Sequence, residues 1–507
     1  MQRHASTYHT HLFYKMDTSE WDSLEQPSIS PYYTSTFHSH IKFGFKNMSS
    51  DDSSNSSNSS SNSENSQTQR YERRRQANRQ FDRMMDEVFM SNPVEVYQMF
   101  NQVPRPPRVP VPRDREDGHS RLWNDYFTDH PVFPPQLFRR RFRMNKHIFL
   151  RIKQTLEERH PFFQQRQDAT GRFGASALQK CTAAMRLIAY GTSADSVDDY
   201  IRISASLARD SLQHFVEGIV SYFSDEYLRK PNEEDLVRLL RIGERRGFPG
   251  MLGSIDCMHW RWKNCPLRLK GMFSGRPGKP TLILEAVASY DLWIWHAFFG
   301  TPGSRNDINV LDRSPLFNDV FEGCAPSINY VVNGRTYNMG YYLTDGIYPK
   351  WAAFIPTISL PQNEKEGLFA KVQEAKRKDV ERAFGVLQAR FAIIRNPALA
   401  RDASMLGKIM IACIIMHNMI VEDERDTYKT YYDPNEYDQA TNASSSNENN
   451  EEPFQFQNSN NRIASLETYM SNRARVRDEA MHKALKKDLV EHMWLKFGVQ
   501  SRDNNMH

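Results

Sequence analysis

The chain has 507 residues, with 66 Lys and Arg against 61 Asp and Glu, and a formal charge of +5 at pH 7. This length allows two or three domains with tails, and so mild a charge requires any nucleic-acid surface to come from local clustering of basic residues. The 5 cysteines are scattered and form no CxxC pair, which argues against a zinc ribbon and favours a reducing compartment. With no signal-peptide pattern and no run of about 18 apolar residues, we expect a soluble intracellular protein with no membrane partner.

Residues 1–70 are rich in Ser, Asn and Thr, a composition that buries too little apolar surface to offset the entropy lost on ordering. We therefore expect a disordered tail over 1–70. Residues 71–116 combine a basic segment that is predicted to form a helix with an extended, proline-rich linker.

Residues 117–249 are predicted to form an all-helical domain. Apolar residues recur at helical spacing at Ile148, Ile152 and Leu156, and a later helix is expected to end at Gly191. Three helices with tight turns are compatible with a helix-turn-helix DNA reader. An ordinary helical bundle is favoured on pattern alone, because no basic recognition helix stands out.

Residues 250–425 are predicted to form a mixed α/β domain in which a β-sheet is flanked by helices. Dense β-branched and aromatic residues indicate strands, with a turn at Tyr290-Asp291 and a hairpin at Asn333-Gly334. From Lys365 onward the pattern becomes helical, and residues 409–421 are apolar enough to form a core helix.

A second Asn/Ser/Glu-rich segment, over 426–461, is predicted to be a disordered linker. Residues 462–507 are predicted to form a C-terminal amphipathic helix and a tail. Its apolar residues, expected to pack on the body of the protein or on a partner, are Leu466, Tyr469, Met470, Leu485 and Leu489.

Four acidic residues stand out, because each belongs to a short phrase at the end of a strand-like run or on a helix: Asp256, Asp307, Asp345 and Glu381. Carboxylates that a fold brings together repel one another and are costly to desolvate, so a stable cluster implies a cation. Two Mg²⁺ or Mn²⁺ ions held by carboxylates are the usual apparatus for cutting phosphodiesters. The pattern therefore predicts a metal-dependent nuclease acting on DNA, with the four acids as ligands.

Each aspartate also has an ordinary structural interpretation. Asp256 lies in an apolar strand, where a turn residue at the sheet end is as well supported as a site residue. Asp307 taken alone is more typical of a helix N-cap, and Asp345 before Gly346 is typical of a turn. Aromatic and basic residues alternate after Asp256, which suits a nucleic-acid path: Trp260, Arg261, Trp262 and Lys263.

Glu381 lies on the flank of a predicted buried helix stripe, one residue from Val380. Asp379 lies about 200° round the helix from Glu381 and cannot point into the same cleft. The alternative for Glu381 is a solvated ion pair with Arg377, four residues earlier. The basic residues of this segment are interpreted either as a solvated face or as phosphate contacts: Lys376, Arg377, Lys378, Arg382 and Arg390.

The four acids sit within long motifs that follow one another in a fixed order. The motifs are GSIDCMHWRWKNCP, GSRNDINVLDRSPLF, YYLTDGIYPKWAAFI, KDVERAFGVLQARFAIIRNP and IACIIMHNMIVEDER. In this combination they resemble the PIF/Harbinger-type transposase family, particularly its plant branch and the nucleases derived from it. The resemblance covers roughly residues 250–425 and is weaker from about residue 120.

The resemblance implies an RNase H-like catalytic domain with a D-D-E active site and a divalent-metal requirement. Asp256 matches the first acid and Glu381 the glutamate, and 35 residues separate Asp345 from Glu381. Whether Asp307 or Asp345 is the second core ligand stays open, with Asp345 favoured by analogy to related enzymes of this spacing. The implied reaction is hydrolysis of DNA at transposon ends, after which the freed 3′-OH can attack target DNA.

The same resemblance implies DNA as the substrate, a Myb/SANT-like partner protein that supplies much of the DNA binding, and residence in the nucleus. A homo-oligomer is also considered. The competing interpretation is a domesticated, non-catalytic adaptor in a nuclear chromatin complex. The presence of all four acids argues against the adaptor.

Overall fold

The computed structural model of this chain describes residues 76, 111–275, 278–326, 328–425 and 465–503. The predicted disordered segments 1–70 and 426–461, and nearly all of the predicted helix and linker over 71–116, lie outside these residues. From Arg113 onward the described residues fall in one compact unit.

Helices make up the described chain before the first strand. They are α5 (Arg115–Tyr126), α6 (Pro135–Phe142), α7 (Lys146–Arg159), α8 (Ala177–Tyr190), α9 (Asp198–Ile201), α10 (Ala205–Tyr227) and α11 (Glu233–Arg245), with a 3₁₀ helix at Ala194–Val197. The predicted stripe of α7 is confirmed, because Ile152 and Leu156 are fully buried. α8 ends at Gly191 as predicted, and the φ of 60° at this residue favours glycine. The helix-turn-helix interpretation stays a prediction.

The sheet has five strands in the order β3-β2-β1-β6-β7. The strands are β1 (Met251–Arg261), β2 (Thr281–Ala288), β3 (Ile294–Pro302), β6 (Tyr341–Thr344) and β7 (Phe354–Pro356). β1 pairs antiparallel with β2, and β2 with β3, whereas β6 runs parallel to both β1 and β7. The predicted mixed sheet is therefore confirmed, and it sets β1, the strand of Asp256, in its centre.

The remaining short elements lie between the strands. They are α12 (Leu267–Phe273), α13 (Asp307–Leu311), a 3₁₀ helix at Pro315–Phe317, α14 (Asn318–Glu322), and the hairpin strands β4 (Tyr330–Val332) and β5 (Arg335–Tyr337). The predicted hairpin is confirmed, because Asn333 and Gly334 adopt positive φ values of 51° and 80° between β4 and β5. Two positive φ angles in a two-residue loop match the twist of the flanking strands.

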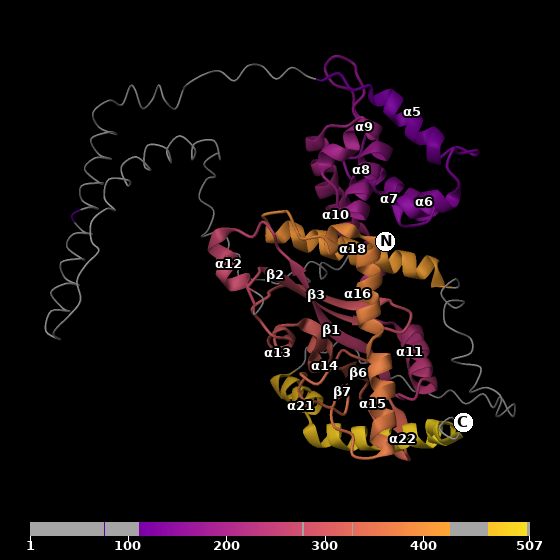
Figure 1. Cartoon of the computed structure of the whole chain (residues 1–507), viewed down its shortest axis with the longest axis vertical. Helices are drawn as coiled ribbons and strands as arrows, with labels where there is room; N and C mark the ends of the chain where they lie inside the picture. Colours follow the sequence, from indigo (N-terminus) through magenta and orange to yellow (C-terminus); the bar gives the residue numbers. More distant parts are fainter. Residues whose placement is uncertain (1–75, 77–110, 276–277, 327, 426–464, 504–507) are drawn as a thin grey trace, which may run out of the picture. The chain divides into compact units, whose positions relative to one another are not determined.

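Helices cover both faces of the sheet. After β7 come α15 (Glu364–Arg377), α16 (Asp379–Arg390), α17 (Ala392–Arg395) and α18 (Ala403–Asp423). Figure 1 shows α15 and α16 following one another along the sheet. On this face Trp260 of β1 shares a core with Val380 and Leu387 of α16. On the other face Ile255 of β1 packs with Leu311 at the end of α13.

The C-terminal segment forms two helices, α21 (Leu466–Val476) and α22 (Glu479–Asp503), where one was expected. Leu485 and Leu489 of α22 are buried in a core with Phe369 of α15, so their predicted packing on the body is confirmed. Leu466 and Met470 do not pack on the body, because these side chains are 78% and 54% exposed. Their packing on a partner stays a prediction. A separate α21 turns these two residues towards solvent.

By length and composition alone, α18 could cross a membrane, and among the described helices only α18 meets this test. Its apolar window is 83% buried inside the protein, as predicted for a core helix. All 5 cysteines are free thiols in the structure.

Candidate metal centre

Strand register brings Asp256 and Asp345 to the same level of the sheet. Ser254 of β1 is paired with Leu343 of the parallel strand β6. Asp256 lies two residues beyond Ser254, and Asp345 lies two residues beyond Leu343, at the carboxyl end of β6. Because side chains two residues apart along a strand share a face, the two carboxylates lie at neighbouring positions.

Glu381 approaches Asp256 from α16, on the same side of the sheet. The Arg377 guanidinium lies between them, with one nitrogen 2.7 Å from the Glu381 carboxylate and 3.7 Å from that of Asp256. The predicted ion pair between Arg377 and Glu381 is therefore present. Its second partner, Asp256, was not predicted, since a helix pattern gives no information about the strand beneath it.

Asp307 approaches the middle of β1 from the opposite face. Its expected role as a helix N-cap is wrong, because Asn306 accepts the capping hydrogen bond and Asp307 is the first residue of α13. The Cys257 thiol instead acts on the Asp307 carboxyl by opposing the rise in its pKa. Cys257 follows Asp256 in β1 and therefore points to the other face of the sheet. Asp345 keeps the turn geometry expected of it, since one carboxylate oxygen accepts the amide N–H of Ile347 at 3.1 Å.

The three aspartates act on one another electrostatically. Burial raises the pKa of Asp256 to about 6, opposed by the Cys257 amide and by Arg377, and the charges of Asp345 and Asp307 add to the rise. Burial also raises the pKa of Asp307, and Asp345 is the next largest cause. Two carboxyl groups with raised pKa values, each near the charge of Asp345, indicate a region with more negative than positive charge.

This donor set fits hard divalent cations. All four predicted ligands are carboxylates, the type preferred by Mg²⁺ and Mn²⁺, and the Arg377 guanidinium can balance only one of the four charges. The carboxylates do not form a closed cage: no three of these described residues have ligand oxygens that all lie within 4.8 Å of one another. Among the described residues that spacing is met by His160, His214 and Glu217, on the helices before the sheet. Binding of a cation would therefore draw the acids together.

Among the alternating residues after Asp256, the aromatic side chains are buried and the basic side chains are exposed. Trp260 and Trp262 are 2% and 1% exposed. Their indole N–H groups donate to the backbone carbonyls of Asn396 and Ala400. The predicted aromatic contribution to a nucleic-acid path is therefore wrong, because both rings belong to the core.

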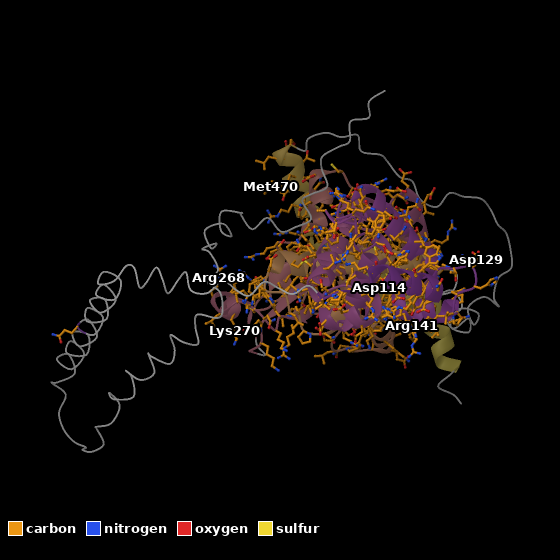
Figure 2. All side chains as sticks on the ribbon, turned by 90° about the horizontal axis from the view of Figure 1, so that it is seen from above. Asp114, Asp129, Arg141, Arg268, Lys270 and Met470 are labelled. Carbon is orange, nitrogen blue, oxygen red and sulfur yellow. The ribbon has the colours of Figure 1, made fainter. Side chains whose placement is uncertain are left out.

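Exposed basic side chains remain near the carboxyl end of β1. They are Arg261, Lys263, Arg268 and Lys270. Arg268 and Lys270 come from α12, and Figure 2 shows them at the margin of the body.

The basic segment around Glu381 is also less exposed than predicted. Arg377 is held between Asp256 and Glu381, and the buried Arg390 pairs with Glu424 at 3.0 Å. The buried Asp379 accepts from Arg246 at 2.6 Å and also pairs with Arg382. Phosphate contact therefore cannot be assigned to this segment as a whole. Arg246, which fixes the start of α16, was missed because no local pattern joins α11 to α16.

Comparisons with known proteins indicate the family of this chain. Residues 225–428 match the family described as plant transposon protein, and residues 118–157 match a domain of unknown function. The resemblance found in the sequence is thereby confirmed at the level of the family. No solved structure matches the chain at a significant level.

Three curated proteins are similar to this chain at low identity. An ALP1-like protein of Arabidopsis thaliana is 25% identical over 261 residues, which span 50% of this chain and 62% of that protein. HARBI1 of Bos taurus, which its name describes as a candidate nuclease, is 22% identical over 49% of this chain and 68% of its own. The Arabidopsis protein named antagonist of like heterochromatin protein 1 is 22% identical over 49% of this chain and 63% of its own. The chain thus spans somewhat under two thirds of the two Arabidopsis relatives.

Proposed function

Since residues 225–428 form a plant transposon protein domain, we propose that the chain is a Harbinger-type transposase or transposase-derived nuclease. It hydrolyses DNA phosphodiester bonds with divalent metal ions. The observation that carries this proposal is that Asp256, Asp345 and Glu381, from two neighbouring strands and the helix over them, lie together where β6 ends beside the middle of β1. The five-stranded mixed sheet with helices on both faces supports an RNase H-like assignment.

Asp256, Asp345 and Glu381 would hold the metal ions, with Asp307 close by. Asp345 is the better candidate for the second core ligand, because it lies level with Asp256, whereas Asp307 arrives from the other face. When bound, a pair of Mg²⁺ or Mn²⁺ ions supplies an activated water and stabilises the leaving 3′-oxygen.

Neighbouring residues position these ligands. Arg377 holds the carboxylates of Asp256 and Glu381 on the same side of the sheet. The Cys257 thiol favours the ionised form of Asp307, and the Tyr348 hydroxyl lies 3.8 Å from the Cys257 sulfur. Asp256 must be ionised to bind a cation, so its raised pKa of about 6 makes the site weaker below that pH.

DNA would follow the exposed basic residues beyond β1. Arg261, Lys263 and Lys270 are exposed and are proposed to contact backbone phosphates of the bound DNA. Since the net charge is only +5, a second protein of the Myb/SANT-like type is proposed to supply further DNA binding. With DNA as the proposed substrate, the nucleus is the proposed location.

Nicking of supercoiled plasmid in Mg²⁺ or Mn²⁺ tests the proposal. Wild-type protein is expected to cut, and Asp256→Asn, Asp345→Asn and Glu381→Gln are each expected to lose cutting, because each removes a ligand charge. Asp312→Asn is the matched control, since this aspartate is 55% exposed and lies just beyond α13. Equal cutting by Asp312→Asn and Glu381→Gln would overturn the assignment.

A non-catalytic adaptor in a chromatin complex is the second candidate. The relative named as an antagonist of like heterochromatin protein 1 supports it, since that name describes a regulatory role. The adaptor predicts no cutting by the wild type or by any variant, together with tight binding of a nuclear partner that Asp256→Asn leaves unchanged.

A further inference from the structure

A cavity of about 490 Å³ on the helical part of the molecule is lined mostly by arginine. Its lining residues are Leu137, Arg140, Arg141, Arg143 and Tyr190. Three of these five side chains are positively charged and none is acidic. The arginines come from α6 and the residue that ends it, and Tyr190 is the last residue of α8.

The charges in this cavity have no acidic partner in the described part of the chain. Neither Arg140 nor Arg143 forms an ion pair there, whereas the neighbouring Arg139 pairs with Glu424. The Nε of Arg143 is buried and has no hydrogen-bond partner among the described residues. A buried guanidinium N–H without an acceptor is costly, so the cavity favours an anion that can accept from it.

The arginine cluster is held in place before any ligand arrives. Arg141 donates to the Tyr126 hydroxyl, and its guanidinium lies 4.0 Å from the centre of the Phe133 ring. Arg143 has a left-handed backbone with a φ of 62°, which costs a non-glycine residue about 1–2 kcal/mol. Its guanidinium lies 5.5 Å from the centre of the Tyr190 ring. Fixed side chains and a strained backbone are typical of binding sites.

A chain of contacts connects the cavity to the strand of the candidate metal centre. Next to Tyr190, Gly191 packs against Asn396, whose side-chain amide lies close enough to exclude any Cβ at that position. The carbonyl of Asn396 accepts the indole N–H of Trp260, which lies four residues along β1 from Asp256. A DNA held at the cavity would therefore keep a fixed relation to the strand of the metal centre.

We propose that this arginine-lined cavity binds a backbone phosphate of the DNA substrate. Guanidinium groups match phosphate oxygens with paired hydrogen bonds, and the volume admits a phosphodiester with its sugar beside the Tyr190 ring. The proposal rests on the proposed function, because it takes DNA as the substrate. The α6 arginines lie in the segment that matches only a domain of unknown function.

Salt-dependent DNA binding tests the cavity separately from catalysis. The probe is a fluorescein-labelled DNA duplex of mixed sequence, titrated with full-length protein in EDTA so that no cutting occurs. Arg143→Gly is the main variant, because glycine accepts the positive φ and folding is preserved. We expect roughly tenfold weaker binding and a salt slope lower by about 1, which corresponds to one lost phosphate contact.

Matched variants complete the experiment. Arg143→Lys keeps a charge and should restore part of the binding, whereas Arg209→Ala removes an exposed arginine of α10 and should change little. Arg140→Ala tests the cavity without touching the strained residue. If Arg143→Gly and Arg140→Ala both bind DNA with the affinity and the salt dependence of the wild type, the cavity proposal is overturned. The nuclease proposal is then unaffected. The cavity proposal would also be overturned if these two variants lost binding to anionic vesicles or to free phosphate but bound DNA as the wild type does.

Discussion

Asp379 and Glu381 lie two residues apart on α16, yet the fold treats their charges in opposite ways. Asp379 is fully buried and is paired with Arg246 at 2.6 Å and with Arg382. Glu381 has 42% of its side chain exposed and shares a single guanidinium, that of Arg377, with Asp256. Asp379 therefore has its own arginine partners, whereas Glu381 and Asp256 share one arginine, Arg377.

This contrast separates a structural carboxylate, Asp379, from Glu381, the one proposed to bind a metal ion. A buried ion pair fixes the start of α16 and leaves no charge for a ligand. Burial, with the charge of Asp345, raises the pKa values of Asp256 and Asp307 instead, so a bound cation would stabilise their ionised forms. The arginine-lined cavity at α6 has the opposite excess of charge, because its lining includes three arginines and no acidic residue.

Removing the paired acid should have the largest effect on stability. Asp379→Asn leaves the 3% exposed Arg246 side chain without its countercharge, so we expect about 3–5 kcal/mol of destabilisation. Urea unfolding measures it. The specific activity of the folded fraction should stay close to wild type, and a change under about 1 kcal/mol would contradict the comparison.

Replacing Asp256, which shares the Arg377 guanidinium with Glu381, should change stability in the opposite direction. The pKa of Asp256 is about 6 in the folded protein and about 4 when unfolded, so the native state loses stability as pH rises through that range. In metal-free buffer at pH 7, Asp256→Asn should therefore stabilise the protein, by on the order of 2 kcal/mol. Urea unfolding of both proteins at pH 4 and pH 7 checks this, since the gain should vanish at the lower pH.

His417 offers a third case, a buried base kept neutral. Burial, with the neighbouring Arg390 charge, lowers its pKa to about 3. Because the unfolded pKa is about 6.5, stability from this group is complete above pH 6.5 and falls by about 1.4 kcal/mol per unit as pH drops towards 3. Unfolding free energies measured between pH 7 and pH 5 should show this slope. His417→Gln should flatten it, and exposed His130→Gln should not.

The smallest effect is expected at the arginine-lined cavity. Arg143→Gly relieves a left-handed backbone, and the added freedom of glycine in the unfolded chain offsets part of that gain. We expect a net stabilisation of about 0.5 kcal/mol, seen as a slightly higher melting temperature. A clear loss of stability would show that the Arg143 side chain supports the fold.

Much of the fold could be predicted because its signals are local. The Asn333-Gly334 hairpin, the helix end at Gly191 and the apolar core helix that includes Cys413 each follow from neighbouring residues. The break after α21 was missed, because Leu466 and Leu485 suit one amphipathic pattern and only packing on α15 decides which is buried.

The acids could be chosen from the sequence, but their surroundings could not. Pattern alone could not place Arg377 beside Asp256, since that contact joins a helix to a strand more than a hundred residues earlier. It could not assign the N-cap to Asn306 in place of Asp307, because both residues suit that position. The burial of Trp260 and Trp262 depends on carbonyl groups from a distant segment.

Uptake of Mn²⁺, measured by calorimetry, tests the central claim that Asp256, Asp345 and Glu381 form a cation site. The wild type should bind Mn²⁺, and Asp256→Asn combined with Asp345→Asn should abolish that uptake. His214→Ala, which alters the other group of ligand-type side chains, should leave it unchanged. Equal uptake by the wild type and the double aspartate variant would contradict the account.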